Sequence, residues 1–210
     1  MLAKIQAYTQ HPDMGPEDFI AYCARVSNPS NQMNHETNDR LLAYLMRHSH
    51  WSPFEMVSVT MEINTTRDIA RQILRHKSFS FQEFSQRYAD ASEIGFIHNR
   101  ETRLQDFKNR QNSVDSDDID LQSWWEEAQY DIAFAVQEIY AEALQRGIAK
   151  EQARAILPEG LTKSRLYMAG TLRSWIHYID LRASNGTQKE HMQIAEACRA
   201  ELKKVFPRLF

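Results

Sequence analysis

The sequence predicts an α+β fold in which helices surround a small, mostly antiparallel sheet. Apolar and polar side chains alternate over residues 54–63, as expected for a half-buried strand. Apolar side chains recur at helical spacing over residues 16–26 and 35–48, which predicts two helices. A chain of 210 residues can bury a full hydrophobic core. No internal boundary is apparent, so residues 1–210 are expected to form a single domain.

Caps and breakers predict the remaining elements. Residues 65–77 are expected to form a helix, because Thr-Thr-Arg-Asp at its start has the composition of a cap. A Ser-x-x-Glu capping box opens a long helix over residues 123–146, and Gly147 closes it. Residues 100–122 are polar and are expected to form a surface excursion. The other expected elements are a weak strand at 1–10, a short helix at 150–157, a β-like piece at 161–169, and helices at 171–181 and 187–204. The last of these helices is expected to open with a second capping box, Thr187-x-x-Glu190.

Composition narrows the class of protein. No apolar run approaches the ~20 residues that span a bilayer, and the first residues lack a secretory pattern, so a cytoplasmic location without a membrane is expected. A net charge of -3 argues against a nonspecific nucleic-acid binder. Cys23 and Cys198 are far apart and form no Cys-x-x-Cys motif, which excludes a cysteine zinc site and a disulfide scaffold. Each is interpreted as a small core residue.

The most informative stretch is residues 75–88, with the sequence Arg-His-Lys-Ser-Phe-Ser-Phe-Gln-Glu-Phe-Ser-Gln-Arg-Tyr. It places cations, hydroxyls, amides and a carboxylate between aromatic side chains. A core segment would leave these polar groups without partners, and an ordinary surface would not carry so many aromatic rings. The mixture favours a pocket for a large, flat, anionic ligand.

Two other interpretations of the charged residues remain open. Three arginines recur every four residues: Arg67, Arg71 and Arg75. They could form a solvated face of a helix or the surface of a nucleotide- or RNA-binding module. A metal hydrolase would instead use His48, His50 and His76 with an aspartate. No third ligand is apparent beside the first two histidines, so no metal is expected.

The stretch at 75–88 resembles the signature of the flavin-dependent thymidylate synthases, which is Arg-His-Arg/Lys, seven residues and then Ser. Here these positions are Arg75-His76-Lys77 and Ser85. Further segments resemble the family in the family's order over about residues 24–194. They are Ala24-Arg25-Val26-Ser27, His48-x-His50, Ser52-Pro53-Phe54-Glu55, Arg71-Gln72, Glu83-x-Ser85-x-Arg87-Tyr88, Ala153-Arg154-x-x-Leu157-Pro158, Leu172-Arg173, Leu181-Arg182 and Gln188-x-Glu190.

The resemblance implies an activity and its partners. The family makes dTMP from dUMP, with methylenetetrahydrofolate as carbon donor, NADPH as reductant and FAD as hydride carrier. Its members are homotetramers of mixed α/β subunits, and each active site is shared between subunits. We therefore expect the family fold and the same ligands here.

The resemblance also implies roles for individual residues. FAD is expected to contact Ser27, Ser52, Arg75, His76, Lys77, Glu83, Arg173 and His177. The dUMP is expected to contact Gln72, Arg75, Glu83, Phe84, Ser85, Gln86, Arg87, Arg154 and Arg182. His50 is expected on the folate side. Arg87 and Arg154 suit the dUMP phosphate, because a guanidinium can pair with a phosphate through two hydrogen bonds.

Arg182 is the expected catalytic residue. Neither cysteine lies in a ligand-like segment, so C5 of the uracil should be activated by charge and not by a thiolate. Arg182 at the N3/O4 edge of the base would stabilise its ionised form by ~3–4 kcal/mol. Ser85 is assigned to binding, because an unactivated serine is a poor nucleophile. Arg182 follows Arg173 by nine residues, so an ideal helix would turn it to the opposite side. It could join the same ligand if the helix ends there, or it could face another subunit's site.

The chain departs from the family pattern at several positions. Lys77 replaces the more usual arginine and keeps the charge without the planar fork. Thr171 stands where many members have asparagine, Gly186 where some have a flavin-stacking histidine, and Met56 where a histidine is common. Residues 159–165 are one residue longer. These differences bear on the details of flavin contact.

Overall fold

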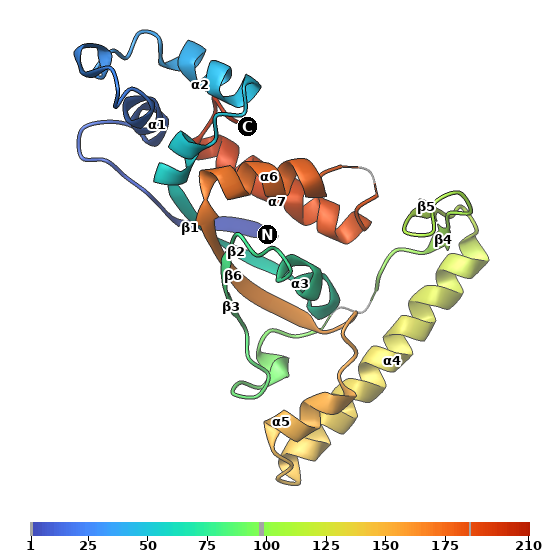
Figure 1. Ribbon diagram of the computed structural model, residues 1–210. Coiled ribbons are helices and arrows are strands. Elements are labelled where there is room, and N and C mark those ends of the chain that lie inside the picture. Colours follow the sequence, from blue (N-terminus) through green and yellow to red (C-terminus); the bar gives the residue numbers. More distant parts are fainter. Residues whose placement is uncertain (1, 97–98, 185) are drawn as a thin grey trace.

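The computed structural model describes residues 2–96, 99–184 and 186–210, and a four-stranded antiparallel sheet lies at its centre (Figure 1). The strands lie in the order β1-β2-β6-β3, and they comprise β1 (Ala3–Tyr8), β2 (Ser58–Thr66), β6 (Lys163–Thr171) and β3 (Ser80–Glu83). β2 and β6 pair from Ser58 with Thr171 to Thr66 with Lys163. The predicted α+β class with a small antiparallel sheet is confirmed.

Three helices cover one face of this sheet: α3 (Arg67–Ile73), α6 (Leu172–Arg182) and α7 (Lys189–Val205). The alternation in β2 turns Val59, Met61 and Ile63 toward these helices, where all three are buried. Trp175 of α6 is fully buried against them, and its indole N–H donates to the carbonyl of Val59. The ends of α3, α6 and α7 are thereby held on a rigid layer.

A smaller group of helices packs beside the start of α6. It comprises α1 (Pro16–Ala24), α2 (Asn38–Arg47) and the 3-10 turns η1 (Pro29–Asn31) and η2 (Ser52–Met56). Phe54 of η2 is fully buried, and η2 contacts both α1 and α6. η2 therefore links these helices to the main core.

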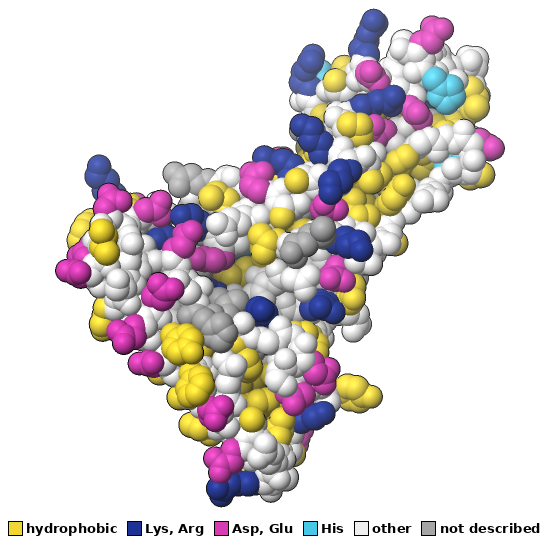
Figure 2. All heavy atoms as spheres, turned by 180° about the vertical axis from the view of Figure 1, so that it is seen from behind, with side chains coloured by type: hydrophobic (Ala, Val, Ile, Leu, Met, Phe, Trp, Pro, Cys, Tyr) yellow, Lys and Arg dark blue, Asp and Glu magenta, His cyan; other side chains and the backbone are white. Residues whose placement is uncertain are grey.

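The longest helix, α4 (Ile119–Gln145), runs away from the sheet, with α5 (Lys150–Ala153) and the 3-10 turn η4 (Arg154–Ile156) at its C-terminal end (Figure 1). A small separate core joins Tyr140 to Ala91, Phe96 and Leu157. Many apolar side chains of α4 are exposed: Ile119, Trp124, Trp125, Tyr130, Ile132, Phe134 and Ile139. Seen from behind, apolar and acidic side chains are interspersed over this part of the surface (Figure 2).

The structure changes several predicted boundaries. Residues 52–56 form the 3-10 turn η2 and not the start of a strand, because Pro53 fits the first turn of a helix and Phe54 is drawn into the core. Pairing with β6 extends β2 to Thr66. The helix predicted over 65–77 ends at Ile73, because Phe79 is pulled inward and its ring packs against Trp175 with centroids 4.9 Å apart.

Two predicted capping boxes are also wrong. α4 begins at Ile119, because the carboxylate of Asp118 accepts from the backbone N–H of Leu121 at 2.9 Å, four residues before the predicted start. The hydroxyl of Thr187 donates to the carbonyl of Leu181 and does not cap α7. In α7 the cap position belongs to Gln188, whose side chain is engaged elsewhere.

The polar excursion at 100–122 contains a short hairpin, β4 (Arg103–Gln105) and β5 (Ser113–Asp115). The ion pair between Arg103 and Glu190 ties it to α7, and so does the ion pair between Lys189 and Asp115, at 3.1 Å. Strands this short and polar carry little pattern, which is why the sequence did not predict them. The remaining 3-10 turn, η3 (Ala91–Glu93), precedes this region. Within the described ranges, no helix is long and apolar enough to cross a membrane.

Candidate active site

The turn that follows α3 meets the C-terminal end of α6, and three predicted site residues lie around this contact. Arg182 is the last residue of α6, and its Nε donates to Nε2 of His76 at 2.9 Å. The His76 ring lies edge-on to Tyr178 with centroids 4.9 Å apart. Gln72, in the last turn of α3, contacts Nδ1 of His191 through Oε1 at 3.2 Å. We call these five residues the α3–α6–α7 cluster.

Both histidines of this cluster are neutral at physiological pH. Burial, and then the charges of Arg182 and Arg75, lower the pKa of His76 to about 4. Burial, Arg182 and His76 lower the pKa of His191 to about 4 as well. A neutral His76 offers Arg182 a lone pair and not a second positive charge.

Among the described residues, His76 is the only hydrogen-bond partner of the Arg182 side chain, and the bond uses Nε alone. It fixes the plane of the guanidinium and leaves the two terminal amino groups for a ligand. An oriented, partly buried guanidinium of this kind suits an anion or the carbonyl edge of a base.

A second group surrounds the turn that follows β3. The backbone N–H groups of Tyr88 and Ala89 both donate to the carbonyl of Ser85, which closes the turn. Three cations converge there. Arg87 lies 3.4 Å from the carboxylate of Glu151, Nε of Arg154 donates to the Glu151 carbonyl at 3.3 Å, and Nζ of Lys150 donates to the Tyr88 carbonyl at 3.1 Å. We call Ser85, Arg87, Lys150 and Arg154 the β3-turn cluster.

Glu83 and Gln86 flank this turn and point inward. The carboxylate of Glu83 accepts from the hydroxyl of Ser164 at 2.8 Å and lies 3.6 Å from Arg67. Gln86 is buried, yet its Nε2 has no partner among the described residues. A buried donor without an acceptor is costly, so Gln86 suits a place that a ligand or another subunit completes. Phe84 lies between them, half-buried, and its N–H donates to the carbonyl of Arg165.

A third group lies where η2 meets the start of α6. Arg173 donates to the carboxylate of Glu55 at 2.6 Å, and both side chains are partly exposed. The exposed ring of His177 meets Trp51 edge-on, with centroids 4.6 Å apart. Ser52 begins η2 and is exposed beside them. The Arg173 cation and these flat rings, next to the N-terminus of an 11-residue helix, fit the diphosphate and ring systems of a dinucleotide.

His50 lies close to this third group, in an exposed set of rings. Its centroid is 5.8 Å from Tyr44 and 6.2 Å from His48. The backbone places it there, because α2 ends in a Schellman motif. In that motif the N–H of His50 donates to the carbonyl of Leu45, and Ser49 takes the left-handed conformation with φ 57°.

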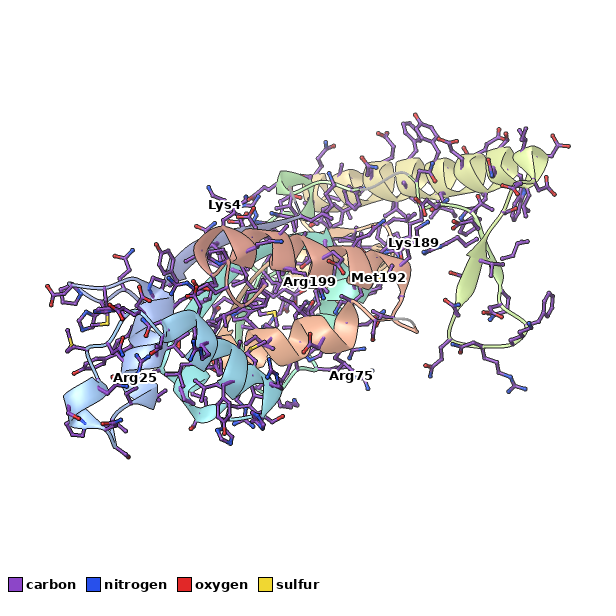
Figure 3. The ribbon with its side chains drawn as sticks, turned by 90° about the horizontal axis from the view of Figure 1, so that it is seen from above. Lys4, Arg25, Arg75, Lys189, Met192 and Arg199 are labelled. Carbon is purple, nitrogen blue, oxygen red and sulfur yellow. The ribbon has the colours of Figure 1, made fainter. Side chains whose placement is uncertain are left out.

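Some predicted residues are not brought into these groups. Arg75 and Lys77 are exposed on either side of His76, and Figure 3 shows Arg75 reaching outward near the end of α6. Ser27 is exposed after α1, and no described contact joins it to another predicted site residue.

The predicted dUMP residues therefore form two separate sets within one chain. Arg67 at the start of α3 touches Glu83, whereas Gln72 in its last turn belongs to the α3–α6–α7 cluster. Nine residues separate Arg173 from Arg182, about 14 Å along a helix. No described contact joins Arg182 to the β3-turn cluster. The helix does end at Arg182, as one of the two predicted conditions required.

The structure disfavours the two other interpretations. Arg67 is buried and paired with Glu83 and Glu159, and Arg71 also pairs with Glu159, so the basic stripe is largely neutralised. Arg75 lies beyond the end of α3. Among the described residues, no three His, Cys, Asp or Glu side chains are arranged to hold a metal ion.

Sequence reasoning missed Lys150, Tyr178 and His191. A signal for His191 was available, because it shares an apolar helical stripe with Ile194 and Cys198 and is fully buried. Lys150 had no signal of its own, since only folding brings it to the Tyr88 carbonyl.

Comparisons with known proteins show to which family the chain belongs. A family model described as "Thymidylate synthase complementing protein" matches residues 7–208. A "Probable flavin-dependent thymidylate synthase" of Paramecium bursaria Chlorella virus 1 is 53% identical over 91% of this chain and 87% of its own length. The chain belongs to the flavin-dependent thymidylate synthase family. A second relative of that name, from Synechocystis sp., is 50% identical over 98% of this chain and 93% of its own length.

A solved structure is also similar throughout. It is described as a UMP/dUMP methylase, PolB from Streptomyces cacaoi, bound with 5-Br dUMP, and it matches with a TM-score of 0.84 at 26% identity. The match covers 99% of this chain and 91% of that one. The resemblance to flavin-dependent thymidylate synthases predicted from the motifs is confirmed.

Two departures from the family pattern have local explanations. Thr171 caps α6, since its hydroxyl accepts from the N–H of Ser174. Gly186 has φ 93°, a conformation that side chains rarely adopt, so a histidine here would strain the turn. Met56 is exposed at the end of η2.

Proposed function

We propose that this protein, as one domain over residues 1–210, converts dUMP to dTMP with methylenetetrahydrofolate as carbon donor, NADPH as reductant and FAD as cofactor. One observation carries the proposal: the guanidinium of Arg182 is fixed by a neutral histidine at the end of α6, in the same cluster as Gln72. This is a preorganised positive charge with free donors, which a reaction that builds negative charge on a pyrimidine needs. Free cysteines are compatible with the cytoplasm, where we place the protein.

Arg182 is the catalytic residue of this proposal. Its free amino groups would hold the N3/O4 edge of the uracil and stabilise its ionised form, which makes C5 nucleophilic. Its charge persists because His76 is neutral. A thiolate route is disfavoured, because Cys198 is fully buried and burial raises the pKa of its thiol. Burial raises the pKa of the Cys23 thiol too.

The β3-turn cluster would bind the phosphate of dUMP. Arg87, Lys150 and Arg154 supply three positive charges around one turn, and the arginines can pair with phosphate oxygens through two hydrogen bonds. Ser85 presents an exposed hydroxyl at the same turn. Gln86 and Glu83 would contact the rest of the nucleotide. The buried, unpartnered amide of Gln86 supports this role.

FAD would lie along the third group, against Ser52, Arg173 and His177, and would reach Arg75, His76 and Lys77 at the end of α3. When bound, it carries hydride between NADPH and the nucleotide. The protein's part is to pair the diphosphate with cations and to hold the flat rings beside Trp51 and His177. Ser27 and Glu83 complete the proposed FAD set, and His50 would face the folate.

Both halves of the dUMP site are proposed to meet between subunits of a homotetramer. Two observations support this assembly. The two sets of dUMP residues lie apart within one chain, and α4 exposes a run of apolar side chains that a monomer would leave in water. The expected solution mass is four times the 24.6 kDa of the chain.

The test of the activity is a visible spectrum of protein that has been saturated with FAD and desalted, followed by dUMP turnover. We expect a retained flavin band that NADPH bleaches without oxygen, and dTMP formed only when dUMP and methylenetetrahydrofolate are both present. Colourless protein would refute the FAD assignments of Arg75, His76 and Arg173 together. UMP is the comparison substrate, because the solved relative is described as acting on both nucleotides.

Sharing of the site is tested by co-expression. Arg182→Ala and Arg87→Ala disable different halves, so each alone should be inactive, and mixed assemblies should regain part of the activity. Arg182→Ala co-expressed with Gln72→Ala is the matched control, because both changes disable the same half and no intact site can form. Equal inactivity of the two mixtures would show that one chain carries the whole site.

A further inference from the structure

A chain of side-chain hydrogen bonds runs behind Gln72, from the core to the surface of α7. The hydroxyl of Tyr178 lies 3.1 Å from Nε2 of His191, and Nδ1 of His191 lies 3.2 Å from Oε1 of Gln72. Nε2 of Gln72 donates to Oε1 of Gln188 at 2.7 Å, and Nε2 of Gln188 donates to Glu190 at 2.9 Å. The other carboxylate oxygen of Glu190 is paired with Arg103. Figure 3 shows this start of α7, marked by Lys189 and Met192, facing the hairpin.

The carboxylate at one end fixes the direction of every bond. A carboxylate only accepts, so Gln188 must turn its N–H group to Glu190 and its oxygen to Gln72. Gln72 then donates to Gln188 and turns its own oxygen to His191. That oxygen only accepts, so neutral His191 carries its proton on Nδ1 and accepts the Tyr178 hydroxyl at Nε2.

His191 anchors this series of hydrogen bonds in the core. It is fully buried, as is Tyr178, whereas Gln72 is half-buried at the end of α3. The terminal torsion of a glutamine has broad minima, so its amide orientation needs outside constraint. His191 hydrogen-bonds to the oxygen of the Gln72 amide, and Gln188 hydrogen-bonds to its nitrogen. One N–H and one oxygen lone pair of this amide remain available.

We propose that His191 is a positioning residue for nucleotide binding, because it sets which way the Gln72 amide faces the dUMP. The inference rests on the dUMP-binding role proposed for Gln72. His191 itself does not touch the nucleotide. It lies behind Gln72, and its effect is to hold the amide ready before the ligand arrives, which lowers the ordering cost of binding.

Two isosteric substitutions separate positioning from mere packing. In His191→Asn the amide occupies the place of Nδ1 and can still donate to Gln72. In His191→Gln the amide extends to the place of Nε2, which keeps a partner for Tyr178 and removes the donor to Gln72. Both variants put a neutral polar group in the same buried space, so their costs in stability are matched. Leu202→Ala leaves a cavity at another buried position of α7 and controls for destabilisation alone.

The measurement is dUMP titration of FAD-loaded protein, followed by steady-state kinetics. His191→Gln is expected to raise the dUMP Kd and KM about tenfold, the effect of one lost buried hydrogen bond, with kcat and flavin retention nearly unchanged. His191→Asn is expected to stay within about threefold of wild type. Leu202→Ala should lower the melting temperature without changing the dUMP Kd.

Three results would overturn the inference. They are an unchanged Kd in His191→Gln, an equal loss in both His191 variants, and a loss that follows the melting temperature in all three proteins. If the His191 variants do not fold, Glu190→Gln tests the proposal instead. An amide at this position can donate as well as accept, so it no longer fixes the direction of the hydrogen bonds from Gln188 to His191, and dUMP binding should weaken. Unchanged binding in Glu190→Gln would then reject the role. Wild-type protein that does not bind dUMP would refute the proposed function itself, and unchanged binding in Gln72→Ala would refute the role of Gln72.

Discussion

Acid should destabilise this protein through His191, and the effect can be calculated. The pKa of His191 falls from an ordinary 6.5 to about 4 in the folded protein, because the ring is buried beside Arg182 and His76. Between these values the unfolded chain binds a proton that the folded protein does not. Stability therefore falls as the pH drops from about 6.5 to about 4 and is unaffected above that window.

The size of the effect follows from the shift. At a pH of about 5 the unfolded histidine is almost fully protonated and the folded one is about one-tenth protonated, a difference of about 2 kcal/mol. The full shift corresponds to about 3 kcal/mol. For a chain of this length, 2 kcal/mol lowers the melting temperature by roughly 4–8 °C.

The assay compares melting temperatures of wild type and His191→Asn across this pH window, at one protein concentration because subunit association adds to stability. His76 titrates in the same window but is present in both proteins, so the difference between the two curves isolates His191. We expect the wild-type curve to fall more steeply as the pH is lowered. Parallel curves would refute the buried, neutral state of His191.

Three further substitutions have definite outcomes. Arg182→Ala should lower turnover about 10²–10³-fold with the flavin band retained, and near wild-type turnover would remove its catalytic role. Arg199→Ala is the control and should leave turnover unchanged, because this partly exposed arginine of α7 pairs, among the described residues, only with Glu196 of its own helix. Gly170→Ala should cost about 1–3 kcal/mol, because an added Cβ would lie 2.5 Å from the Phe79 ring, and an unchanged melting temperature would show that the ring moves freely. Ser49→Gly should raise stability by up to about 1 kcal/mol by relieving a left-handed serine, and a loss in urea denaturation would contradict that reading.

The helices and strands could be predicted from the sequence where the pattern of apolar residues is local and periodic. β2 and the helices around it were predicted to within a few residues, because alternation and helical spacing report directly which face is buried. Boundaries failed where tertiary contacts decide them. α3 stops early because Phe79 is recruited to the core, and η2 replaces strand because Phe54 is buried at a turn.

The motifs predicted which residues belong to the site but not which of them lie next to one another. Arg182 lies 106 residues after His76 in the sequence, and only folding brings its guanidinium to the turn that follows α3. Gln72 joins the same cluster through His191 of α7, which lies 119 residues away in the sequence. Arg87 and Arg154 converge only because α5 and η4 return to the turn after β3. A sequence motif can indicate which residues bind a ligand, but it does not show which of them lie close together in the folded protein.

The division into halves has a physical reason in this fold. The sheet and its helices form one rigid layer, so residues at opposite ends of α3 and α6 cannot be moved together by a loop. A nucleotide has an anionic end and a flat base. In this chain three cations lie at the β3-turn cluster, where Arg87 is paired with Glu151, and the oriented guanidinium lies at the end of α6. A second subunit that sets one end against the other would join them without any strain in either chain, and burial of the apolar side chains that α4 exposes would favour such an association.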